Sequence, residues 1–105
     1  MKLEDIHFHD STIVRVIEVP EHDLLAIELD YPVDWQASVF APRTVLFHDV
    51  LRYVVAEGPF AGKPTILEHA VSMDGERKRI VLRTNAGERS LSYARIELLD
   101  GHGAV

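Results

Sequence analysis

Hydrophobic and polar residues alternate along most of this chain with the two-residue period that is typical of β-strands. The run Thr12–Val19 is rich in β-branched residues, which favours an extended strand. In residues 24–31 one face carries Leu25, Ile27, Leu29 and Tyr31, and the opposite face carries Glu28 and Asp30. Residues 20–23 begin with proline and end with aspartate, which favours a turn. The pattern predicts an antiparallel hairpin whose second strand has one buried face and one solvated face.

Further runs with the same alternation follow. Residues 65–73 and 79–84 flank the turn dipeptide Asp74-Gly75 and predict a second hairpin. The last run, 91–98, keeps one apolar face only if it shifts near Ala94-Arg95. Residues 43–55 fit a strand and an amphipathic helix alike, but their valines and aromatic residues favour a strand with a bulge at His48-Asp49.

The stretches between these runs are predicted to be irregular. Two prolines bracket residues 32–42, glycine and proline fill four of the seven positions 58–64, and residues 101–105 are expected to be a frayed tail. About six strands with short connections predict an all-β fold, an antiparallel sandwich or a partly open barrel. The predicted core residues share the more apolar strand faces: Leu25, Ile27, Leu29, Ile80, Leu82 and Leu91.

Composition narrows the classes of function. The 105 residues suit a single domain, 1–105, because a second domain would be too short to bury its own core. A formal charge of −6 with scattered basic residues argues against a nucleic-acid partner. The chain has no cysteine, turns acidic at Glu4-Asp5 where a signal peptide would be basic and then apolar, and has no apolar run of about 20 residues, so we expect a cytoplasmic protein without a membrane partner.

Six histidines raise the question of a metal site. His7 and His9 would project from the same face of an extended segment and could share one cation, with an oxygen ligand from Asp10, Asp49 or Glu68. The glycines and glutamate that a cupin barrel places after such a histidine pair are absent. We therefore expect no cofactor, and keep a metal- or small-ligand-binding barrel that uses His7, His9, His48 or His69 as the alternative.

The tripeptide Phe8-His9-Asp10 recurs as Phe47-His48-Asp49. Adjacent strand residues point to opposite faces, which argues against a catalytic His9–Asp10 pair. We expect instead that Phe8 anchors the core, that His9 binds a neighbouring carbonyl, and that Asp10 accepts backbone N–H groups at the start of a strand. No nucleophile elbow and no phosphate loop occur either, so the sequence predicts no catalytic residues and favours a protein that is not an enzyme.

The segment around Phe8, His9, Asp10 and Ser11, followed by a hairpin and the second tripeptide before Val50, resembles a class of small bacterial all-β proteins. Some of these belong to the family called immunity protein fifty of polymorphic toxin systems. The resemblance implies a non-enzymatic protein that binds a cognate toxin, and it carries over no catalytic residues.

Two aromatic residues lie in predicted loops, Trp35 and Phe60. Each would either cover an edge of the core or serve as an anchor in a partner's pocket. An acidic surface would steer such a protein towards basic proteins. The sequence thus predicts a protein-binding module, and a free sheet edge would also allow a homo-oligomer.

Overall fold

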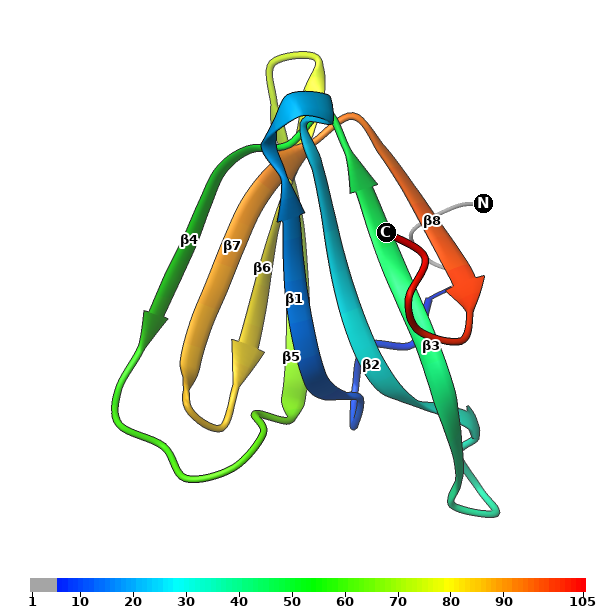
Figure 1. Ribbon diagram of the computed structural model, residues 1–105. Helices are drawn as coiled ribbons and strands as arrows, with labels where there is room; N and C mark the ends of the chain where they lie inside the picture. Colours follow the sequence, from blue (N-terminus) through cyan, green and yellow to red (C-terminus); the bar gives the residue numbers. More distant parts are fainter. Residues whose placement is uncertain (1–5) are drawn as a thin grey trace.

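The computed structural model describes residues 6–105, and in it the chain forms two antiparallel β-sheets (Figure 1). The elements are β1 (Thr12–Val19), the 3-10 turn η2 (Pro20–His22), β2 (Leu24–Asp34), β3 (Val39–His48), β4 (Leu51–Glu57), β5 (Ile66–Asp74), β6 (Arg77–Thr84), β7 (Gly87–Tyr93) and β8 (Arg95–Asp100). The prediction of an all-β antiparallel fold is confirmed.

The two sheets have the strand orders β1-β2-β3-β8 and β4-β7-β6-β5, and they form an open sandwich that does not close into a barrel. The chain passes from the first sheet to the second between β3 and β4, and it returns between β7 and β8. These two passages lie side by side, because the Ala94 amide donates to the His48 carbonyl at 2.9 Å. Both pass through the upper end of the molecule in Figure 1.

These passages explain why the structure has eight strands where about six were predicted. The bulge predicted at His48-Asp49 is a complete change of sheet, and so is the shift predicted near Ala94-Arg95. Asp49 takes a φ of +56°, a left-handed conformation that aspartate tolerates better than most residues. The two-residue period indicated both positions, but the prediction took β3 and β4 as one strand, and β7 and β8 as another.

The prediction of an irregular loop at residues 32–42 is wrong for most of these residues. β2 continues to Asp34 and β3 starts at Val39, so only residues 35–38 form the connection. β1 begins opposite Asp30 and β8 ends opposite Arg43, so the hairpin beyond these positions has no neighbouring strands. Prolines are tolerated there because their missing N–H groups cost no ladder bond.

The core lies between the sheets. All six predicted core residues are at most 1% exposed, which confirms the assignment of strand faces. They pack in one cluster whose further members are Ile6, Phe8, Ile13, Tyr31, Val45, Phe47, Ile66, Tyr93 and Ile96. Alternation along each strand is thus sufficient to identify the inward face.

The outer face of β2 corrects two predictions. Asp30 is exposed as predicted, but Glu28 is only 2% exposed, because residues 101–103 fold back over it and do not fray. The Gly103 amide donates to Glu28 Oε2 at 2.6 Å, and Arg15 Nε donates to Glu28 Oε1 at 2.8 Å. These hydrogen bonds, that of Arg15 above all, hold the pKa of Glu28 below its usual value although burial opposes them.

Candidate protein-contact surface

Four large apolar side chains are exposed on the β2–β3 hairpin: Val33, Trp35, Val39 and Phe40, with exposed fractions between 42% and 63%. We call these four residues the hairpin patch. The hairpin extends beyond the neighbouring strands of its sheet, at the lower right of Figure 1. No strand therefore covers either side of it, and an exposed apolar group of this kind is typical of a contact surface.

Trp35 is the most exposed member of the patch, at 63%, yet its indole is held in place. Its Nε1 donates to Asp10 Oδ2 at 2.9 Å. The turn that carries it is closed by the Ser38 amide, which donates to the Trp35 carbonyl at 3.2 Å, and by the Ala37 amide, which donates to Asp34 Oδ1 at 3.1 Å. The ring is thus presented to solvent in a fixed orientation.

The charged residues of the hairpin itself have one sign. Residues 31–42 contain no lysine, arginine or histidine. Asp30 and Asp34 are exposed on the same hairpin, and Asp10 lies beside Trp35. The surface is therefore apolar and acidic, which complements an apolar and basic surface on another protein.

The surroundings of Asp10 differ from the prediction. His9 Nε2 lies 3.5 Å from Asp10 Oδ2, because Asp10 has a φ of +68° and strand alternation does not apply in this turn. The Asp10 carboxylate accepts the Trp35 indole N–H and, within residues 6–105, no backbone N–H. His9 Nδ1 lies 2.6 Å from the Leu67 carbonyl, as predicted, and Phe8 is buried in the core, also as predicted. Both polar groups thus have structural partners.

The second tripeptide occupies the passage between the sheets. His48 contacts Arg95, with its Nδ1 3.2 Å from Arg95 Nη2, and its Nε2 lies 3.5 Å from Glu97 Oε2. The Asp49 carbonyl accepts a hydrogen bond of 3.0 Å from Arg77 Nε. These residues therefore belong to the corner of the fold and lie on a different element from the hairpin patch.

The histidines do not converge on a metal site in the part of the chain that the structure describes. Residues 6–105 contain no group of three histidine, cysteine, aspartate or glutamate side chains arranged to hold an ion. His69 packs edge-on against the ring of Phe8, with centroids 5.0 Å apart, and burial lowers its pKa. The alternative of a metal- or small-ligand-binding barrel that uses His7, His9, His48 or His69 therefore has no supporting cluster among these residues.

Phe60 is 44% exposed in the connection between β4 and β5. This connection and the β2–β3 hairpin lie at the same end of the sandwich, the lower end in Figure 1. Both aromatic residues that the sequence singled out are therefore available at this end, Trp35 more than Phe60.

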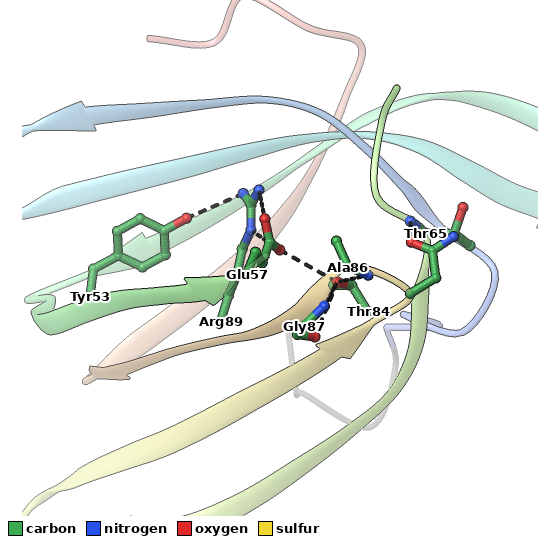
Figure 2. Close-up of polar contacts among 8 residues, drawn as sticks. Tyr53, Glu57, Thr65, Thr84, Ala86, Gly87 and Arg89 are labelled. Atoms are coloured by element: carbon green, nitrogen blue, oxygen red, sulfur yellow. Dashed lines mark hydrogen bonds and ion pairs between the residues drawn. The ribbon is translucent and has the colours of Figure 1, made fainter. Parts of the chain in front are cut away.

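A polar cluster that the sequence did not indicate joins β4 to β7 (Figure 2). Arg89 donates from Nε to Glu57 Oε2 at 2.7 Å and from Nη2 to Glu57 Oε1 at 2.9 Å, and its Nη1 lies 3.4 Å from the Tyr53 hydroxyl. The paired side chains are only 13% and 12% exposed. Thr84 Oγ1 adds a longer contact of 3.4 Å to Glu57 Oε2.

This cluster is suited to holding an edge strand rather than to proton transfer. The hydrogen bonds of Arg89 lower the pKa of Glu57, those of Glu57 raise the pKa of Arg89, and burial raises the pKa of Tyr53. All three groups therefore stay in their ordinary charge states near neutral pH. The two charged residues lie 32 positions apart, so no local motif could have indicated the pair.

Comparison with protein-family models, with curated proteins and with solved structures gives no match to this chain. Within residues 6–105 no helix has the length and apolar character needed to cross a membrane. The hairpin patch and the charge around it are therefore the basis for a functional proposal.

Proposed function

We propose that this protein is a non-enzymatic protein-binding module that docks a basic partner through the hairpin patch. The observation that carries the proposal is the exposed indole of Trp35, held by Asp10, on a hairpin that also exposes Val33, Val39 and Phe40. Large aromatic side chains dominate the binding energy of many interfaces when a partner's pocket desolvates them. Because the Asp10 bond already orders Trp35, binding would lose little side-chain entropy at this anchor.

The acidic charge of the protein indicates which class of partner it would bind. The net charge of −6 and the acidic hairpin favour a partner with lysine and arginine around an apolar pocket. In its finer form, we propose that the partner is a toxin and that this protein is its immunity protein, as the resemblance around Phe8, His9 and Asp10 implies. A nuclease toxin would have the required basic surface, because it must itself grip phosphates.

The experiment captures the partner first and then measures affinity. The wild-type protein is immobilised, the bound protein is identified from a native lysate of the source cell, and its recombinant form is titrated by calorimetry. Trp35→Ala and Phe40→Ala are each expected to weaken binding by about 30-fold or more, the effect of an anchor worth about 2 kcal/mol. Val54→Ala is the matched control, because Val54 is similarly exposed but lies on β4 in the other sheet.

Two results would overturn the binding-module proposal: capture of no protein, or unchanged affinity in both hairpin variants. The finer proposal has its own readout. If the captured protein has a toxic activity that stoichiometric addition of this chain fails to inhibit, the protein is a binding module but not an immunity protein. Phe60→Ala shows whether the β4–β5 connection belongs to the same interface.

A further inference from the structure

The free edges of the two sheets differ in how well they resist pairing with another strand. β1, β4 and β5 each contain a register shift, near Arg15, at Arg52 and at Leu67, and such bulges obstruct a new ladder where they lie. β8 carries charged side chains at Arg95, Glu97 and Asp100. In β5, residues 69–73 read His-Ala-Val-Ser-Met, without a charged carboxylate, lysine, arginine or proline. The shift in β5 lies at its start, and residues 69–73 form the longest run without charge or register shift on any edge strand of the described residues, so β5 is the least protected edge.

Only the first residues of β5 have partners on the side away from β6. The Ile66 amide donates to the Ser11 carbonyl at 2.8 Å, and the Asp10 amide donates to the Ile66 carbonyl at 2.9 Å. Beyond Leu67, no strand among residues 6–105 pairs with this side of β5. The apolar side chains of Leu67, Val71 and Met73 are exposed along it.

We propose that β5 pairs antiparallel with β5 of a second copy of this chain, with Ala70 opposite Ala70 on the two-fold axis. The two four-stranded sheets β4-β7-β6-β5 would then join into one continuous sheet. On one face His69 stands opposite Val71 of the second copy on either side of the axis, and Met73 lies beyond each pair, which forms a mostly apolar stripe. Leu67 lies at the register shift and is not part of this stripe.

The opposite face shows charge complementarity in this register. Within one copy, Glu68 is paired with Arg83, and Ser72 stands opposite Arg79. In the dimer Glu68 would stand opposite Ser72 of the second copy, with Arg79 of that copy one strand further. Arg79 donates to the Ser90 hydroxyl at 2.9 Å, and the ion pairs of the described residues do not include it.

The two-fold axis thus places each Glu68 two strands from Arg79 of the other copy, with only the small side chain of Ser72 between them, so the two charges attract without direct contact. Moving the axis by one residue, to Val71, would place Glu68 opposite Asp74, and two opposed carboxylates destabilise a strand pair. Charge therefore selects Ala70 as the residue on the axis. Because only a few residues pair, the contact is smaller than the standard interface of about 800 Å² per partner, and the dimer is expected to be reversible.

The first test uses sedimentation velocity over protein concentrations from about 1 µM to about 1 mM, the range that reports on a weak dimer. Ser72→Glu places a carboxylate opposite Glu68 of the second copy, but within one copy it faces Arg79, so the fold tolerates it. We expect the dimer dissociation constant to rise at least tenfold. The double variant Glu68→Ser with Ser72→Glu exchanges the two side chains and should restore association, whereas Val54→Glu on the β4 edge should leave it unchanged.

The second test reads the register directly, because the chain has no cysteine of its own. Residues that face each other in a strand pair have Cβ atoms about 5 Å apart, within reach of a disulfide after a small adjustment. Ala70→Cys should therefore form an intermolecular disulfide under mild oxidation. Ser72→Cys is the control, since in this register the two sulfur-bearing residues are offset by about 13 Å along the strand.

Several outcomes would overturn the proposal. A protein that remains monomeric at the highest concentration excludes the dimer. A dimer that Val54→Glu disrupts and Ser72→Glu does not would use the β4 edge instead. Equal crosslinking through Ala70→Cys and Ser72→Cys would refute the register. None of these outcomes depends on the hairpin patch, so failure here leaves the proposed function untouched.

Discussion

The bond between Asp10 and Trp35 makes a prediction that links stability to the proposed contact surface. Asp10 contributes in two ways: its carboxylate accepts the Trp35 N–H at 2.9 Å, and its backbone has a φ of +68°. Substitutions can remove these contributions separately. Asp10→Asn keeps an oxygen acceptor and a side chain that tolerates the left-handed region, Asp10→Gly keeps only the conformational tolerance, and Asp10→Ala keeps neither.

The magnitudes follow from these two terms. Loss of a partly exposed hydrogen bond to a carboxylate costs about 1 kcal/mol. Placing alanine in the left-handed region costs about a further 1 kcal/mol. Asp10→Ala should therefore lower the free energy of unfolding by about 2 kcal/mol, with a smaller loss for Asp10→Gly and the smallest for Asp10→Asn.

Urea denaturation followed by circular dichroism measures these free energies. The chain has a single tryptophan, so the fluorescence anisotropy of the native protein reports on Trp35 alone. Asp10→Ala and Asp10→Gly should lower this anisotropy, and Asp10→Asn should preserve it. A loss of under about 0.5 kcal/mol in Asp10→Ala, within the range of ordinary surface substitutions, together with an unchanged anisotropy, would refute the idea that Asp10 holds the indole.

Three further predictions concern the stability of the fold. Leu29→Ala should lower the free energy of unfolding by about 2–5 kcal/mol, because Leu29 is fully buried, and a thermal melt that shows under about 0.5 kcal/mol would contradict its placement. Gly87→Ala should cost at least about 2 kcal/mol in urea denaturation, because Gly87 has a φ of +147° and a Cβ there would lie 2.3 Å from the Ala56 carbonyl oxygen. The pKa of Glu57 is lowered by Arg89, so the ion pair stabilises the fold fully above about pH 5 and loses this contribution as the pH falls through the lowered pKa. Glu57→Gln should therefore lower stability at neutral pH and flatten its decline in acid, and a parallel decline in both proteins would rule out this linkage.

The alternation of residues predicted the inward faces correctly but not the assignment of strands to sheets. Val45 and Phe47 alternate regularly up to His48, and a period of two continues beyond it. This period does not indicate that the chain leaves one sheet for the other at Asp49. The passage depends on the left-handed φ of Asp49 and on the contact between the Ala94 amide and the His48 carbonyl, which joins segments 46 residues apart in sequence. Local pattern therefore located the corner without revealing its geometry.

The repeated tripeptide has the same structural meaning at both positions. Phe8 and Phe47 are buried, and the aspartate two residues later, Asp10 or Asp49, has a positive φ that turns the chain. The repeat thus marks two places where an extended segment ends on a core aromatic residue and changes direction. Its recurrence is explained by backbone conformation, and no shared site is needed to account for it.

Glu28 shows why polar positions are harder to interpret than apolar ones. A glutamate between Ile27 and Leu29 indicates a solvent-facing position, and this is correct for the face that it occupies. The face is nevertheless covered, because Gly103 lies 75 residues further along the chain and donates its amide to the carboxylate. Coverage by a distant segment leaves no local periodicity, so the burial of Glu28 was beyond prediction.

Trp35 posed the opposite problem, because its type is compatible with burial and with exposure alike. The outcome depends on the length of the hairpin. Pro32 and Pro42 suggested a loop that could fold over the core, whereas the register Pro32 to Phe40 continues the ladder past the ends of β1 and β8. A hairpin that is paired up to Asp34 carries its tip away from the core, and the indole N–H of Trp35 then donates to the carboxylate of Asp10. The exposure of the indole, on which the proposed function rests, is thus a consequence of strand pairing rather than of the composition of the loop.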